Sequence, residues 1–173
     1  MPLDQQPSLR PADVVVALSL ALVPEQSYGE LSQRLHLSRA AAHGGVKRLQ
    51  AATLLLPGSR LANRPSLRDF LLFGVRYAFY AVPGPITRGV ATAHSAPPLR
   101  DEFSTDDVVV WPSPEGQTRG QSLVPLYPGA PLLSRTDPEL YVLLAMIDTL
   151  RIGQARERDR AREWITRRVA GEP

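Results

Sequence analysis

The sequence predicts a mainly α-helical fold with a small β-wing, followed by an extended proline-rich segment and a C-terminal helical hairpin. Two short segments with helical spacing of apolar residues lie on either side of a tight turn within residues 27–51. Nine of the 17 prolines fall in residues 76–135, where regular helix is nearly impossible. Helical spacing returns in residues 136–171, and Gly153 divides that stretch into two helices.

The first short helix is predicted to begin after Ser27. Glu30 follows three residues later, so the two side chains can each accept the other residue's backbone N–H in a capping box. Leu31 and Leu35 lie four residues apart and therefore share one face of this helix. An earlier apolar stretch, residues 14–23, is predicted as a buried helix that packs behind the pair of short helices or pairs with a second subunit.

A turn at residues 36–37 leads to Ser38, which is predicted to cap the second short helix. The buried stripe of that helix is predicted from apolar spacings of four and three. A hairpin then follows, with strands at 53–56 and 60–63 and turn residues between them. This order predicts a winged helix-turn-helix, which places its second helix where it can enter a DNA major groove. The stripe residues are Ala42, Val46 and Leu49.

The predicted outer face of the second helix combines small and basic side chains. Small side chains near its start let the backbone approach a base edge, and Arg39 can donate two hydrogen bonds to guanine. Lys47 and Arg48 lie further along, where neutralising phosphates is the expected role. Arg60 and Arg64 are expected at the wing. The predicted DNA contacts are Arg34, Ser38, Arg39, Ala41, His43, Lys47, Arg48, Arg60 and Arg64.

Several positions within residues 10–75 match one known pattern, namely Glu30-Leu31, Leu35, Leu37-Ser38-Arg39, Val46-Lys47-Arg48-Leu49 and Leu54-Leu55. In these residues the chain resembles the bacterial winged-helix transcription regulators, in the broad MarR-like sense. The resemblance implies sequence-specific binding of double-stranded DNA by a cytoplasmic repressor, acting as a homodimer on a palindromic operator. The chain departs from the pattern at Gly44 and Gly45, since related helices usually carry a longer polar or basic residue at the first of these positions. Each glycine in mid-helix also costs about 1 kcal/mol relative to alanine.

Charge is distributed unevenly along the chain. The formal net charge is +3, and residues 1–75 contain all of the excess, with eight basic and five acidic residues. This excess is modest, so we expect two copies to bind together. The chain has no cysteine, which fits a reducing compartment. No signal peptide and no apolar run of membrane-spanning length is found, so we expect a cytoplasmic location with no membrane partner.

Residues 76–135 are predicted to lie extended over the protein or over a partner, with a short strand at 108–111. The segment contains a near-repeat, because Thr-Arg-Gly occurs at 87–89 and again at 118–120. Each copy is predicted as a turn that exposes one arginine. Arg88 and Arg119 either belong to two unrelated surface turns or bind an acidic partner or a phosphate.

The C-terminal residues, 136–171, are predicted to form two helices. Asp137 caps the first, Pro138 takes its first position, and leucines at helical spacing form its apolar stripe. The second, 154–170, is dense in charge with a narrow apolar edge, which indicates a solvated face with ion pairs. This tail either folds back on the chain or forms an arm for dimerisation or partner binding.

The sequence shows no arrangement typical of an enzyme. The three histidines are scattered without metal-ligand spacing, and no glycine-rich phosphate loop or nucleophile elbow is present. Glu102, Asp106 and Asp107 form an acidic patch that is expected to be a solvated loop. We therefore expect no catalytic residues, no metal and no cofactor.

Two alternatives to a DNA-binding regulator remain open. One is a protein-interaction module or antitoxin-type regulator that binds a neighbouring gene product through the proline-rich segment and the tail. The other is a ligand-responsive sensor with a pocket lined by Tyr77, Phe79 and Trp111.

Overall fold

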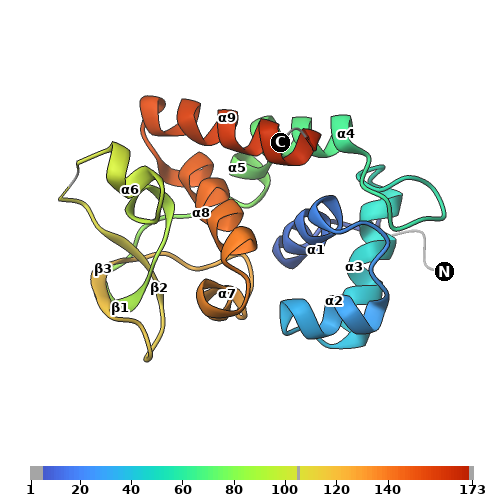
Figure 1. The fold of residues 1–173 in the computed structure, drawn as a ribbon, viewed down its shortest axis with the longest axis horizontal. Helices are drawn as coiled ribbons and strands as arrows, with labels where there is room; N and C mark the ends of the chain where they lie inside the picture. The colour runs from blue at the N-terminus through green and yellow to red at the C-terminus, as the bar shows by residue number, and fades with distance from the viewer. Residues whose placement is uncertain (1–5, 105, 172–173) are drawn as a thin grey trace.

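The computed structural model describes residues 6–104 and 106–171 and has a mixed α/β fold with a small three-stranded sheet. Three N-terminal helices lie at one end of the molecule, the sheet lies at the other, and the helix α8 (Pro138–Ile152) runs between them (Figure 1). One core joins the two ends, because apolar residues from both belong to a single buried cluster.

The N-terminal helices are α1 (Pro11–Leu22), α2 (Tyr28–Leu35) and α3 (Arg39–Ala51). The predicted capping box is present, since the N–H of Glu30 donates to Ser27 Oγ and the Glu30 carboxylate accepts from the N–H of Ser27. His36 ends α2 in the left-handed region at φ 54°, which reverses the chain before α3. Helix α1 is buried along most of its length and packs against α2 and α3.

A short hairpin follows α3 at the predicted position. Leu55 and Ala62 form a single β-bridge, and the N–H of Leu56 donates to the carbonyl of Leu61 at 2.9 Å. The chain then forms α4 (Arg64–Asp69), a π-helical turn (Phe70–Gly74) and α5 (Val75–Ala78).

The prediction of an extended, irregular segment over residues 76–135 is wrong, although the short strand predicted within it at 108–111 is confirmed. This stretch contains β1 (Ile86–Ala91), β2 (Val109–Pro112) and β3 (Thr118–Ser122), the 3-10 turn Ala93–Ser95, and the helices α6 (Leu99–Glu102) and α7 (Ala130–Thr136). Its prolines stand at the borders of these elements, as where Pro85 precedes β1 and Pro112 ends β2, and there the missing N–H is tolerated. Trp111 and Tyr127 of this stretch are buried in the chain's own core.

The three strands close on one another. Strand β1 pairs antiparallel with both β2 and β3, and β2 pairs in parallel with β3 through Val109–Gln121 and Val110–Ser122. The backbones approach closely, because a Cβ added at Gly89 would lie 2.0 Å from the carbonyl oxygen of Trp111. A Cβ at Gly120 would lie 2.4 Å from the carbonyl oxygen of Val108. The glycines of the two Thr-Arg-Gly copies therefore occupy strand positions that no larger residue fits.

The C-terminal tail forms two helices that fold back on the chain, which confirms one of the two alternatives predicted for it. Asp137 caps α8 by accepting the N–H of Leu140 at 3.1 Å. Helix α9 (Ala155–Ala170) runs along one edge of the molecule from α8 to α4 (Figure 1). Its apolar edge, Ala161, Ile165 and Val169, is buried.

Asp148 of α8 is the centre of a buried polar network. Its Oδ2 accepts from Trp111 Nε1 at 2.6 Å and from Thr92 Oγ1 at 2.8 Å, and its Oδ1 accepts from Arg151 Nη1 at 2.6 Å. Arg151 Nε also donates to the carbonyl of Phe79 at 2.7 Å. Burial raises the pKa of the Asp148 carboxyl, and the charge and hydrogen bonds of Arg151 oppose that shift.

Replacing Asp148 with alanine is expected to lower the free energy of unfolding by about 3–5 kcal/mol, because Arg151 and the donors of Thr92 and Trp111 would lose a buried acceptor. Urea denaturation followed by tryptophan fluorescence measures the change. The control is Asp159→Ala, which breaks an exposed pair with Arg162 and should cost less than about 1 kcal/mol. Equal effects of the two substitutions would contradict the conclusion that the buried hydrogen bonds of Asp148 stabilise the fold.

Candidate nucleic-acid interface

One face of α3 is exposed. Ala42, Val46 and Leu49 are buried, as predicted, and the residues on the opposite side of the helix are exposed. Helix α3 lies at the end of the molecule opposite to the sheet (Figure 1). The exposed residues are Arg39, Ala40, Ala41, His43, Lys47 and Ala51.

Ser38 fixes the start of this face by capping the helix. Its Oγ accepts the N–H of Ala41 at 3.1 Å, as the sequence predicts. The guanidinium of Arg39 lies over α2, where a Cβ added at Gly29 would come within 3.4 Å of Nη2. Among the residues that the structure describes, Arg39 and Lys47 have neither a hydrogen-bonded side-chain partner nor an ion-paired carboxylate. Two cations and a run of small residues are thus available to an anionic partner.

Tyr28 brings two further predicted site residues to the same region. Its ring packs edge-on against His43 with centroids 4.9 Å apart, and the guanidinium of Arg60 lies 5.3 Å from its centroid. Arg60 Nε also donates to the carbonyl of Gln26 at 2.7 Å, which ties the hairpin to the turn before α2. Sequence reasoning missed Tyr28, because nothing in the local pattern indicates which distant side chains meet its ring.

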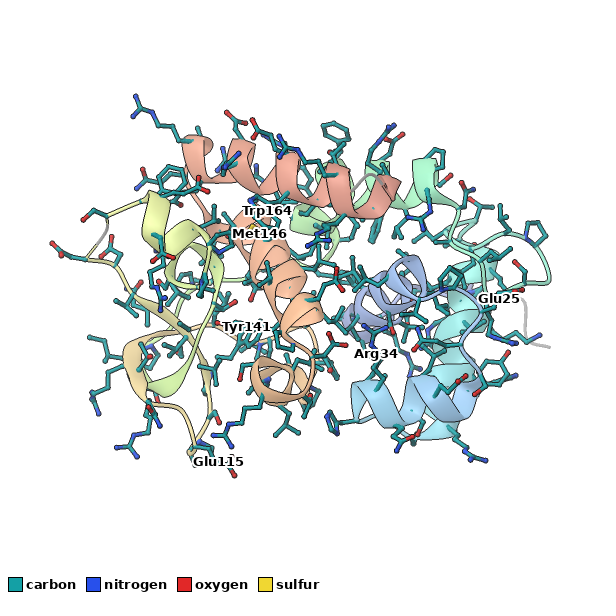
Figure 2. All side chains as sticks on the ribbon, in the orientation of Figure 1. Glu25, Arg34, Glu115, Tyr141, Met146 and Trp164 are labelled. Carbon is teal, nitrogen blue, oxygen red and sulfur yellow. The ribbon has the colours of Figure 1, made fainter. Side chains whose placement is uncertain are left out.

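Three arginines predicted to contact DNA have structural partners within the chain. Arg48 makes a two-pronged contact with Asp13, at 2.8 Å from Nε and 2.7 Å from Nη2, and Asp13 is only 2% exposed. Arg34 Nε lies 2.6 Å from the Oδ2 of Asp137, between the N-terminal helices and α8 (Figure 2). Arg64 donates to the carbonyls of Ala21 and Val169, so it does not lie free at the wing.

The Asp13–Arg48 pair also accounts for one of the two mid-helix glycines. A Cβ added at Gly45 would lie 3.1 Å from Oδ1 of Asp13 and 3.4 Å from Cγ2 of Val16. The glycine therefore allows α1 and α3 to approach beside the ion pair, which offsets its poor helix propensity. The hydrogen bonds to the carboxylate of Asp13 raise the pKa of the Arg48 guanidinium.

The two arginines of the near-repeat lie elsewhere, on the sheet. Arg88 in β1 stands directly opposite Arg119 in β3. The prediction that each copy forms a turn is wrong, since both are strands, but both arginines are exposed as expected.

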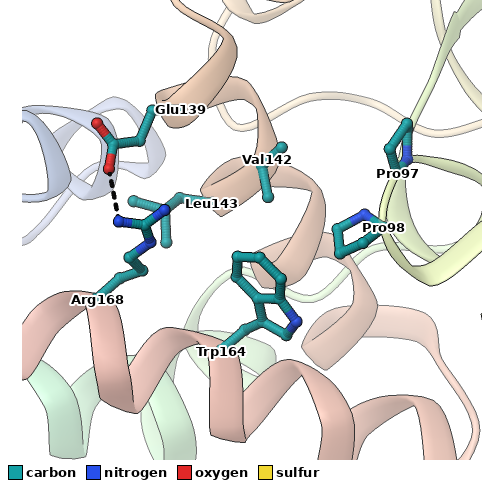
Figure 3. Close-up of a pocket in the computed structure, with 7 residues that line it drawn as sticks. All are labelled: Pro97, Pro98, Glu139, Val142, Leu143, Trp164 and Arg168. Atoms are coloured by element: carbon teal, nitrogen blue, oxygen red, sulfur yellow. Dashed lines mark ion pairs between the residues drawn. The ribbon is translucent and has the colours of Figure 1, made fainter. Parts of the chain in front are cut away.

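An apolar pocket of about 500 Å³ lies between α8, α9 and the chain just before α6 (Figure 3). An ion pair between Glu139 Oε1 and Arg168 Nη1, 3.2 Å long, stands at one side of it. The pocket predicted from Tyr77, Phe79 and Trp111 is wrong, because Tyr77 is 71% exposed and Trp111 is 1% exposed. The observed lining is Pro97, Pro98, Glu139, Val142, Leu143, Trp164 and Arg168.

Within residues 6–104 and 106–171, no three His, Cys, Asp or Glu side chains are grouped so that they could hold a metal ion. None of the helices in the described part of the chain has the length and apolar character needed to cross a membrane. Comparison of the chain with models of protein families, with curated proteins and with solved structures found no match.

Arg48 and Lys47 are neighbours in α3, and their replacement is expected to change stability by very different amounts. Arg48→Ala should lower the free energy of unfolding by about 3–5 kcal/mol, since it leaves the buried carboxylate of Asp13 without its partner. Lys47→Ala, on the exposed face, should change it by less than about 0.5 kcal/mol. Chemical denaturation of both variants tests this prediction. A similar loss of stability in the two would contradict the conclusion that Arg48 has a structural role and Lys47 does not.

Proposed function

We propose that this chain is a sequence-specific DNA-binding regulator that places α3 in the major groove. The observation that supports this most directly is the exposed face of α3, where Arg39 and Lys47 have no carboxylate partner among the described residues. The order of α1, α2, α3 and a short hairpin is compatible with a winged helix-turn-helix.

The residue types along this face suit their positions on the helix. Arg39 is at the N-terminal end, which is the end of a recognition helix that contacts base edges. Ala40 and Ala41 beside it allow the backbone to come close to the bases. Lys47 lies eight residues further along, about 12 Å by helical rise, where the phosphate backbone borders the groove. Arg39 is therefore assigned to base reading and Lys47 to phosphate contact.

A single copy offers few phosphate contacts, so the proposal includes a homodimer on a palindromic site. Phe73, Tyr77 and Tyr80 are 63%, 71% and 75% exposed, respectively, and they supply apolar surface of the kind that subunit contacts bury. These residues follow the hairpin in the chain and do not belong to the exposed face of α3.

Arg39→Ala is expected to weaken the preferred site by about 1–3 kcal/mol and to relax the preference at one base pair. Lys47→Ala should weaken all duplexes alike and reduce the slope of log affinity against log salt by about 1. Sites are first selected from random duplexes at a stated salt concentration, and affinities are then measured by fluorescence anisotropy.

Arg156→Ala in α9 is the matched control, since Arg156 is an exposed arginine away from α3. Its affinity and salt slope should match those of the unchanged protein. Selection that enriches no sequence, together with equal binding by all three variants, would rule out α3 as a recognition helix.

The pocket beside Trp164 supports a second candidate, in which DNA binding responds to a small ligand. Its volume and apolar lining are within the usual range for ligand sites, and Glu139 and Arg168 supply charged groups at its side. Helix α9, which forms one wall, also packs against α4 and α1.

Trp164 gives a direct test of this second candidate. A panel of small aromatic acids, amines and neutral rings should include a compound that changes Trp164 fluorescence and raises the melting temperature. Val142→Trp would fill the pocket and should remove both responses. A response that persists in this variant would place the compound elsewhere.

A further inference from the structure

The two Thr-Arg-Gly copies pair with each other in the sheet. The register sets Thr87 opposite Gly120, Arg88 opposite Arg119 and Gly89 opposite Thr118. Antiparallel pairing of two identical triplets creates a local two-fold axis that passes between the two arginines. The two arginines therefore occupy equivalent positions on either side of this axis.

The backbone brings these arginines as close as a sheet allows. The N–H of Ser113 donates to the carbonyl of Arg88 at 3.2 Å, so the polar groups of Arg88 point toward β2. Arg88 and Arg119 are then a non-hydrogen-bonded pair, in which opposed Cα atoms lie about 4.5 Å apart and the side chains are closest. Both arginine side chains lie on the outer face of the sheet. The residue after each of them, Gly89 or Gly120, faces the other way and is buried.

This arrangement places two like charges together without compensation. Neither arginine has a hydrogen-bonded or ion-paired side chain among the residues that the structure describes. Glu115, in the turn between β2 and β3, pairs with Arg135 at 2.7 Å instead. Like charges directly opposite each other destabilise a sheet, and the paired register of β1 and β3, from Ile86–Gln121 to Gly89–Thr118, sets the two arginines opposite each other.

We propose that Arg88 and Arg119 form a binding site for a phosphate monoester dianion. A dianion neutralises both guanidinium groups, whereas a carboxylate or a phosphodiester neutralises only one. Its tetrahedral oxygens can accept pairs of N–H groups from two forks that approach across a two-fold axis. Gln121 is exposed two residues beyond Arg119, on the same face of β3, and adds an amide donor.

This site is independent of the proposed recognition helix. The sheet and α3 lie at opposite ends of the molecule (Figure 1). Loss of phosphate binding would therefore leave the DNA-binding proposal unchanged, and the converse also holds. The phosphate can come from a free small molecule or from a phosphorylated protein side chain, since both present the same monoester group.

Isothermal titration with inorganic phosphate, at constant ionic strength set with chloride, tests the site. The unchanged protein should bind in a saturable way, and Arg88→Gln and Arg119→Gln should each weaken binding at least tenfold. Arg156→Gln is the control and should bind as the unchanged protein does. Absence of saturable binding, or equal binding by all variants, would overturn the proposal.

A second measurement distinguishes a binding site from a folding defect. Arg88→Gln should raise the melting temperature in low salt, because it removes the repulsion. Saturating phosphate should raise the melting temperature of the unchanged protein but not that of the variant. A lower melting temperature for the variant in low salt would show that the pair is not repulsive and would contradict the site.

Two further ligands identify the source of the phosphate. A short phosphoserine peptide that binds more tightly than inorganic phosphate, while its unphosphorylated form does not bind, would indicate a phosphorylated protein. Equal binding of peptide and phosphate would indicate a free small ligand. Displacement of phosphate by an equal concentration of duplex phosphodiester would refute selectivity for a dianion.

Discussion

The buried carboxylate of Asp148 is the constraint on which the rest of the structure depends. It accepts hydrogen bonds from β2 through Trp111, from the residue after β1 through Thr92, and from its own helix through Arg151. Arg151 in turn bonds the backbone that follows α5. A carboxylate this deeply buried is costly unless all its donors are in place, so the sheet, α8 and the end of α5 cannot shift independently. This network orders a stretch that is rich in proline.

Sequence reasoning succeeded where the determinants are local. The caps at Ser27, Ser38 and Asp137 are as predicted, because each depends only on residues three positions away. It failed in residues 76–135 for two reasons. A high proline content disfavours regular helix, but these prolines stand at the borders of elements and leave the strands and helices between them intact. The inward positions of β1 and β3 include glycines, so the alternation of apolar residues that marks a strand is absent.

The candidate interface shows the same division between local and distant determinants. Helical periodicity was enough to predict that Arg39, His43 and Lys47 are exposed. It was not enough for Arg34 and Arg48, whose acidic partners lie 103 and 35 residues away in the sequence. A basic residue on a helix is recognised as structural only when its partner is known, and no local pattern supplies that knowledge. Of the basic residues predicted on α2 and α3, only Arg39 and Lys47, on the exposed face of α3, have no acidic partner among the described residues.

Contacts at the last turn of α9 join the pocket to the helices behind α3. Arg168 borders the pocket through its pair with Glu139, and the carbonyl of the next residue, Val169, accepts from Arg64. Arg64 also donates to the carbonyl of Ala21 at the end of α1, and α1 packs against α3. A ligand that separated Arg168 from Glu139 would therefore act on a turn that Arg64 holds to α1. Arg64 therefore links the last turn of α9, beside the pocket, to α1, which packs against α3.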